Sequence, residues 1–478
     1  MKNQVYNPFL PLDAYIPDGE PHIFGDRVYL YGSHDREGGR TFCMEDYTVY
    51  SAPVDDLSDW RCEGVIYSAK QDPDYNERPF MYAPDAVQGN DGRYYLYYCM
   101  SGDFGFGGYF GPISVAVCDT PAGKFEFLGY VHYSDGTRAG EREGDEAMFD
   151  PGVLTEGDRT YMYTGFCWSY AKDRHGAMVT VLGPDMLTVI EEPRFVLPSG
   201  QYSKGTGFED HEYFEAPSIR KYNDIYFLIY SSVKFHELCY ATSSSPTEGF
   251  KYRGVIISNT DIGIDSYKKA SVPAFYGANN HGGIISMDSG DYIFYHRHTD
   301  GTNFSRQGCI ERIKIEKDGF IKQAEITSEG AEKGHFKGKG EYPAYIACNL
   351  FCDKEQTYTG DPGTFLGPDF PRITMDGYDD PHDINYVTNM VSGSTVGYKY
   401  FDIKDLTEIR VWVRGFVDGD FSFRIGIDGV NLGSVHIEKE NYWAEHVIKV
   451  DHVTAEAAAL YFEYRGTGAL QFLKFELN

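Results

Sequence analysis

Aromatic and aliphatic residues recur at a fixed spacing along the first two thirds of the chain. Five short runs share one pattern, in which a polar or Gly turn is followed by Tyr, Phe, Ile, Leu or Val. The runs are DRVYLYG (26–32), GRYYLYYC (92–99), DRTYMYTG (158–165), DIYFLIYSS (224–232) and DYIFYHRH (291–298). This composition, bounded by Gly or Asp, predicts a β-strand in each run. The central positions are 66 residues apart, and they are Tyr29, Tyr95, Tyr161, Phe227 and Ile293.

A fixed period of this length indicates a repeat architecture. Sixty-six residues hold about four short strands with their turns, which is one blade of a β-propeller. Five such blades account for residues 1–330. The sequence therefore predicts a five-bladed propeller as the first domain.

The remaining residues lose the 66-residue period but keep the composition of strands. Residues 325–343 are rich in Gly, Lys and Glu, and we expect a linker over 331–340. Between 341 and 478, apolar runs return about every ten residues, separated by turns such as Asp418-Gly419 and Asp428-Gly429, which is typical of a β-sandwich. We therefore expect an all-β protein, with the propeller followed by a jelly-roll-like sandwich and no long amphipathic helix.

The repeat also locates candidate chemistry. A titratable residue precedes each central strand position by ten to twelve residues, and the five are Asp18, Asp85, Asp150, Glu215 and His281. The innermost strands of a propeller face one central channel, so equivalent positions in five blades converge although they are distant in sequence. The alternative reading is that Asp-Pro and Asp-Gly serve only as turn residues.

Charge and composition narrow the classes of partner. The formal net charge is −29, which disfavours nucleic acid and anionic membrane surfaces, because both require Lys and Arg patches. Nine cysteines without a CxxC pair read mostly as buried thiols. The first fifteen residues contain no apolar core of a signal peptide, so we expect a cytoplasmic protein, or a secreted one if the natural chain is longer. Oligomeric state stays open.

Several of these segments resemble glycoside hydrolase family 43, the five-bladed propeller family of arabinofuranosidases, xylosidases and arabinanases. The matching segments, in order, are PDGEPHIFGDRVYLYGSHD, MYAPDAVQGNDGRYYLYY, FDPGVLTEGDRTYMYTG, FEAPSIRKYNDIYFLIYSS and NNHGGI with YIFYHRH. The last 140 residues or so resemble a carbohydrate-binding β-sandwich of the family 6 type. That domain either binds sugar, with Tyr442, Trp443 or Tyr464 as stacking rings, or supports the propeller structurally.

The resemblance implies an inverting glycoside hydrolase. Inversion needs a base and an acid that hold a water and the substrate between them, with carboxyl groups about 6.5–9.5 Å apart. Asp18 matches the family's base and Glu215 its acid. Asp150 is expected to raise the pKa of Glu215 by its charge and to anchor the substrate.

Further positions follow from the same resemblance. Arg297 matches a substrate-binding arginine, for which a surface salt bridge is the alternative. His281 matches a residue that often helps to hold an axial calcium ion, with water completing the shell, and no cofactor is otherwise required. The expected substrate-binding side chains are Asp85 and the aromatic residues Tyr82, Phe149, Trp168 and Phe214. The Gly-rich loop 102–111 is a candidate wall of the pocket.

Three functions of different kinds are compatible with the sequence. We favour an exo-acting hydrolase of plant-type glycans containing arabinose and xylose, first an α-L-arabinofuranosidase, with a β-D-xylosidase or a galactofuranosidase on the same scaffold as alternatives. An inactive carbohydrate-binding propeller and a protein-interaction propeller are the non-enzymatic readings. The expected partner is a small oligosaccharide or a glycan side chain.

Overall fold

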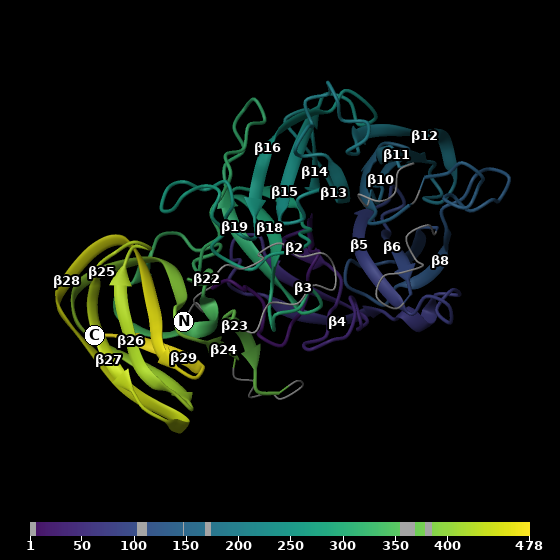
Figure 1. The fold of residues 1–478 in the computed structure, drawn as a ribbon. Helices are drawn as coiled ribbons and strands as arrows, with labels where there is room; N and C mark the ends of the chain where they lie inside the picture. The colour runs from purple at the N-terminus through teal and green to yellow at the C-terminus, as the bar shows by residue number, and fades with distance from the viewer. Residues whose placement is uncertain (1–5, 103–111, 147, 168–173, 354–368, 378–384) are drawn as a thin grey trace.

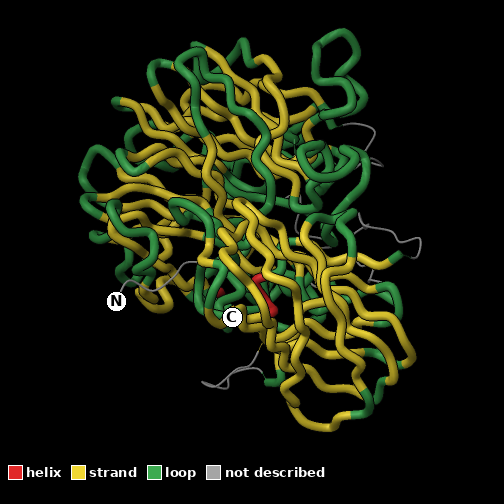
Figure 2. Tube along the Cα trace, turned by 90° about the vertical axis from the view of Figure 1, so that its left-hand side faces the viewer, coloured by secondary structure: helices red, strands yellow, loops and turns green. Residues whose placement is uncertain are grey.

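The computed structural model describes residues 6–102, 112–146, 148–167, 174–353, 369–377 and 385–478. Strands dominate the described chain, and the helices described in it are two 3₁₀ turns, Ala69–Gln71 and Ala344–Ile346 (Figure 2). Within these ranges no helix has the length and apolar character that a membrane crossing requires. The expectation of an all-β fold is confirmed.

Five antiparallel sheets follow one another along the chain up to Ile313 (Figure 1). Strands β1 (Glu20–Phe24), β2 (Arg27–Tyr31), β3 (Tyr47–Pro53) and β4 (Arg61–Tyr67) form the first sheet, and β5 (Phe80–Gln88), β6 (Tyr94–Ser101), β7 (Ser114–Cys118) and β8 (Glu126–Tyr130) the second. The third holds β9 (Gly152–Glu156), β10 (Arg159–Thr164), β11 (Gly176–Leu182) and β12 (Val189–Pro198), and the fourth β13 (Tyr213–Tyr222), β14 (Ile225–Ser232), β15 (Glu237–Ser243) and β16 (Lys251–Ser258). The fifth holds β17 (Ile284–Met287), β18 (Gly290–His298) and β19 (Arg306–Ile313).

The 66-residue repeat coincides with these sheets. Its five central positions all fall in the second strand of a sheet, namely β2, β6, β10, β14 and β18. The first strands contact one another in a closed ring, β1–β5–β9–β13–β17–β1. A ring of first strands is the geometry of a five-bladed propeller, and it places the starts of these strands around one axis.

The C-terminal domain is one ten-stranded sheet that folds over on itself. Its strands are β20 (Phe336–Lys337), β21 (Gly340–Pro343), β22 (Asn349–Cys352), β23 (Arg372–Met375), β24 (Asn385–Met390), β25 (Ser394–Gly415), β26 (Asp418–Ile425), β27 (Asn431–Ile437), β28 (Glu440–Thr467) and β29 (Leu470–Leu477). The two longest strands, β25 and β28, pair along their length and pass from one layer to the other. Asp405, His452 and Ala457 take left-handed backbone conformations where these strands bend.

Aromatic rings fill the space between the two layers. Phe462 of β28 lies 5.3 Å from Phe472 and 5.2 Å from Phe475 of β29, measured between ring centroids. All three side chains are fully buried. The expected sandwich is therefore confirmed. Tyr464 is also fully buried, so this ring cannot stack on a sugar, whereas Tyr442 is exposed.

The residues expected as a linker, 331–340, are part of the packed structure. Phe336 is almost fully buried and pairs with Phe401 of β25, and β21 pairs with β29 from Gly340 onwards. One continuous hydrophobic core runs from blades four and five into the sandwich. The Gly- and Lys-rich composition misled the prediction, because the buried side chain of Phe336 decides where this segment packs.

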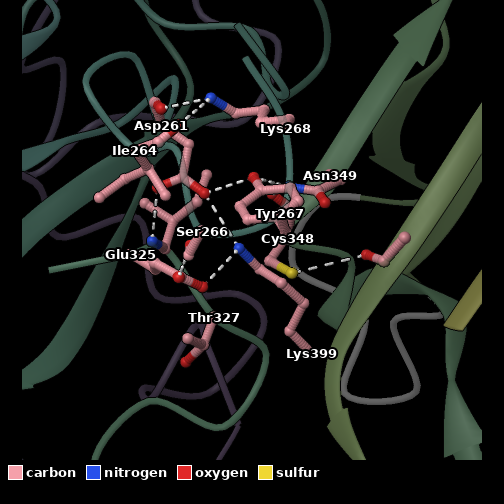
Figure 3. Close-up of polar contacts among 12 residues, drawn as sticks. Asp261, Ile264, Ser266, Tyr267, Lys268, Glu325, Thr327, Cys348, Asn349 and Lys399 are labelled. Atoms are coloured by element: carbon pink, nitrogen blue, oxygen red, sulfur yellow. Dashed lines mark hydrogen bonds and ion pairs between the residues drawn. The ribbon is translucent and has the colours of Figure 1, made fainter. Parts of the chain in front are cut away.

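A buried ion pair lies at the junction of the two domains (Figure 3). The Nζ atom of Lys399 lies 3.0 Å from Oδ2 of Asp261, 3.4 Å from Oε2 of Glu325 and 3.8 Å from the ring centroid of Tyr267. Lys399 and Asp261 are both fully buried. Burial opposes the charge of Lys399, but the carboxylate of Asp261 outweighs it and holds the pKa of Lys399 well above its ordinary value.

Breaking this pair should destabilise the whole chain. Lys399→Met keeps the length of the side chain but leaves Asp261 as a buried carboxylate without its cation, so we expect a loss of about 3–5 kcal/mol in the free energy of unfolding. Denaturant unfolding measures this loss. The matched control is Lys474→Met, which breaks an ion pair with the exposed Glu341 and should cost less than about 1 kcal/mol. Equal losses in the two variants would contradict a structural role for the junction.

Candidate active site

Three carboxylic acids stand where inner strands begin. Asp18 and Asp150 each lie two residues before their strands, β1 and β9, and Glu215 is the third residue of β13. We call this end of the propeller the catalytic face. The three side chains are close enough that the charge of Asp18 raises the pKa of Asp150, and the charges of both raise the pKa of Glu215.

The backbone is strained at each of these acids. Asp18 and Asp150 have φ of 56° and 50°, and Ala216, directly after Glu215, has φ of 64°. Residues other than Gly rarely adopt this left-handed backbone conformation. It is concentrated at functional sites, because the surrounding structure must hold the backbone in it. The shared strain turns each strand start so that its acid stands at the axis.

A buried arginine holds Asp18. Nη1 of Arg306 donates to Oδ1 of Asp18 at 2.8 Å, while Nε and Nη2 form a bidentate pair with Asp35 at 2.7 and 3.0 Å. On the other side, the backbone N–H of Asp18 donates to Nδ1 of His296, whose Nε2 lies 2.8 Å from the carbonyl of Asn279. Burial lowers the pKa of His296 well below its usual range, so this ring is neutral. Asp18 therefore faces one permanent positive charge, that of Arg306.

A second chain of charges leads from Asp150 along the axis. Nδ1 of His281 lies 3.8 Å from Asp150, and Nε2 lies 3.5 Å from Oε1 of Glu20. The other oxygen of Glu20 accepts from Arg220 at 2.6 Å and from Ser218 at 2.8 Å. Burial disfavours the charged form of His281, but the hydrogen bond to Glu20 and the charge of Asp150 outweigh it and raise its pKa to about 9.

The pKa values of two acids on the axis are raised. Burial, together with the charge of Asp18, raises the pKa of Asp150 to about 7, although His281 opposes the shift. Burial and the charge of Asp150 raise the pKa of Glu215 well above its ordinary value. A carboxyl group in such surroundings keeps its proton near neutral pH and is able to donate it.

A series of aromatic rings in mutual contact includes Phe149 and Phe214, the residues directly before Asp150 and Glu215. The ring of Tyr82 lies 5.7 Å from that of Phe149, and Phe166 lies 5.2 Å from Phe149 and 5.3 Å from Phe214. The side chains of Tyr82, Phe149 and Phe214 are nearly buried among their neighbours, whereas Phe166 is half-buried. Trp168 and the loop 103–111 lie outside the described residues.

Two of the predicted binding residues are placed elsewhere. Arg297 is buried against the C-terminal domain, where its guanidinium donates to Gln307 and to the backbone carbonyls of Tyr345 and Ala347. The prediction that Arg297 binds substrate is therefore wrong, and the alternative of a surface salt bridge is wrong as well. Arg306, nine residues later, occupies the site.

The carboxylate of Asp85 is also occupied by hydrogen bonds inside the propeller. It is fully buried and accepts from His22 at 2.5 Å and from the backbone N–H groups of Ala86 and Val153 at 2.8 and 2.7 Å. These contacts tie blades one, two and three together and leave no role for Asp85 in substrate binding. The register of the repeat could not indicate that the carboxylate of Asp85 is occupied by contacts between blades.

Comparison with known proteins identifies the family of this chain. The family model described as glycosyl hydrolases family 43 matches residues 6–321. The chain belongs to this family. A protein of Thermoclostridium stercorarium named xylosidase/arabinosidase is 55% identical over 478 residues, which cover 100% of this chain and 99% of the relative. A xylosidase/arabinosidase of Bacteroides ovatus is 28% identical over 67% of this chain and 96% of its own length.

Solved structures of the family share the architecture. A family 43 enzyme of Xanthomonas citri in complex with xylotriose superposes with a TM-score of 0.53 and 25% identity, covering 67% of this chain and 94% of that one. An arabinoxylan arabinofuranohydrolase of Bacillus subtilis, solved with cellotetraose, covers 98% of this chain and 96% of its own with a TM-score of 0.50. At 19% identity, this second likeness concerns the fold alone, and it extends over both domains.

Proposed function

We propose that this family 43 chain is an inverting, exo-acting hydrolase that removes terminal α-L-arabinofuranose from glycans containing arabinose and xylose. Removal of β-D-xylose is the second candidate, because the relative that matches the full length is named for both sugars. The observation that supports the proposal is that two acids of the site have opposite electrostatic surroundings. Glu215 has a pKa raised well above its ordinary value, whereas Asp18 is paired with Arg306.

The different surroundings of the two acids give each of them a different step of the hydrolysis. Glu215 gives its proton to the oxygen of the leaving group as the glycosidic bond breaks. Asp18 accepts a proton from a water molecule whose oxygen bonds to the anomeric carbon from the opposite face. Both acids recover their protonation states by exchange with solvent. Arg306 holds the carboxylate of Asp18 in place, and Asp150 keeps the proton on Glu215.

A calcium ion near His281 would supply charge at the axis, but the described residues do not suit it well. Calcium takes six to eight oxygen ligands, and the carboxylates within 4 Å of the imidazole are those of Glu20 and Asp150. Calcium thus stays a proposal, and no step of the mechanism depends on it. A melting temperature unchanged by calcium or by a chelator would count against it.

The substrate panel that tests the proposal consists of 4-nitrophenyl α-L-arabinofuranoside, β-D-xyloside and galactofuranoside. We expect release of 4-nitrophenol from the first and, more slowly, from the second. Glu215→Gln should lose activity most on natural glycans, whose leaving groups need protonation, and less on activated aryl glycosides. Asp18→Asn should lose activity on both, since water activation is required in either case. Equal losses for Glu215→Gln on the two substrate types would exclude its role as the acid.

Asp150→Asn should shift the pH dependence. The charge of Asp150 raises the pKa of Glu215, so its removal lowers that pKa, and Glu215 then loses its proton at a lower pH. We expect the alkaline limb of kcat/KM to move to lower pH by about one unit or more. Asp158→Asn is the matched control, an exposed acid at the far turn of the same blade. An alkaline limb that stays in place would show that Asp150 does not control the acid.

A further inference from the structure

A cavity of about 220 Å³ is hollowed into blade three. Charged and aromatic side chains line it, among them Arg142, Asp145, Glu146, His175, Glu192 and Phe195. None of these residues belongs to the cluster of acids on the axis. The size is below that of sites for drug-sized ligands and suits a single small ring.

The wall of the cavity includes residues next in the chain to the segments that carry the acids. Among them are Met148, two residues before Asp150, and Thr164, the last residue of β10. Directly after Thr164, the N–H of Gly165 donates to the carbonyl of Phe149 at 3.0 Å. Two residues of chain span at most about 7 Å, which is comparable with the length of one sugar unit. A substrate chain leaving the axis over blade three therefore reaches this cavity with its next units.

Three rings pack against one another at the wall of the cavity, tilted by 50° and 34° between neighbours. The ring centroid of His175 lies 4.6 Å from that of Phe195 and 4.4 Å from that of Tyr202. Phe195 and Tyr202 remain 47% and 44% exposed. Apolar ring faces left in water next to a cavity match the C–H faces of a sugar ring, which is apolar above and below its plane.

Fixed polar groups surround the rings. Arg142 pairs with Glu192 at 2.7 Å and with Asp145 at 3.2 Å, and His175 pairs with Glu146 at 2.5 Å. Three carboxylates thus face one arginine and one histidine, so the cavity offers hydrogen-bond donors and acceptors but no unpaired basic group for a phosphate. This arrangement suits a ligand rich in hydroxyl groups rather than an anion.

We propose that this cavity binds the β-linked xylose backbone next to the sugar that is cleaved, with Phe195 as the stacking ring. The inference rests on the proposed function and adds to it. It assigns the leaving-group side of the substrate to blade three, and it makes a polymeric or oligomeric xylan the preferred substrate over a free glycoside.

The test combines binding with turnover. Titration calorimetry of xylotetraose into Glu215→Gln and into Glu215→Gln/Phe195→Ala measures binding without cleavage, and loss of the ring should weaken it about three- to tenfold. In the active protein, Phe195→Ala should raise KM on arabinoxylan by a similar factor and leave kcat/KM on 4-nitrophenyl α-L-arabinofuranoside unchanged. Phe195→Tyr, which keeps the ring, should restore both. The control is Ile190→Ala, at the other end of β12, where the side chain is 48% exposed.

Each outcome decides between the claims. Unchanged affinity for xylotetraose in the Phe195→Ala background overturns the inference while the proposed function stands. A loss shared by arabinoxylan and the aryl glycoside also overturns it, because the ring would then act on the site as a whole. If the wild-type protein cleaves no aryl glycoside, the proposed function fails, and the calorimetric result alone decides whether the cavity binds xylan.

Discussion

Charge balance on the propeller axis is the constraint on which the site depends. Five inner strands begin around one axis, and the fold brings acids from four of them, with Asp35 from the first blade, close to that axis, where all but the half-buried Glu215 are buried. An isolated buried carboxylate is costly, so each must be paired with a cation or keep its proton. Arg306, His281 and Arg220 supply the cations. Glu215 has no ion-pair partner among the described residues. Its negative charge is therefore avoided only if the carboxyl group keeps its proton.

This distribution gives chemically similar side chains different tasks. Arg220 and His281 outweigh the effect of burial on Glu20 and lower its pKa, so Glu20 is a fixed anion that orients His281. Asp35 aligns Arg306, and Arg306 aligns Asp18. Asp18 and His281 are thus held by a second set of charges, Asp35 and Glu20, which take no part in the proposed mechanism. The strand starts take a strained backbone conformation. They can keep it because the five blades, and the sandwich packed against blades four and five, hold them in place.

The sequence predicted the fold well where a pattern repeats. The 66-residue period identified the second strand of every blade, and the register brought Asp18, Asp150, Glu215 and His281 to the axis. The prediction failed where a single bend or contact decides how a segment packs. Apolar runs about every ten residues predict separate strands in the C-terminal domain, but residues 394–415 form one strand, β25, because a bend at Asp405 keeps the pairing with β28.

The site was predicted less completely than the fold. Arg297 and Arg306 lie on adjacent paired strands, and their sequence surroundings gave no indication of which guanidinium reaches Asp18. Glu20 stands in the segment PDGEPHIF, and its pairing with Arg220 of blade four could not be predicted from sequence spacing. Successive side chains along a strand point to opposite faces of the sheet, so one residue faces the site and its neighbour does not. Which of the two faces the site is known only once the strands are paired.

The central claim is that Glu215 and Asp18 act on opposite sides of the sugar with a water molecule between them. Proton NMR of the first sugar released, recorded before the anomers equilibrate, tests it most directly. The account predicts that a substrate of α configuration yields the β anomer first, and a β-xyloside the α anomer. Release with retained configuration would contradict it, because Asp18 would then have to bond to the sugar itself.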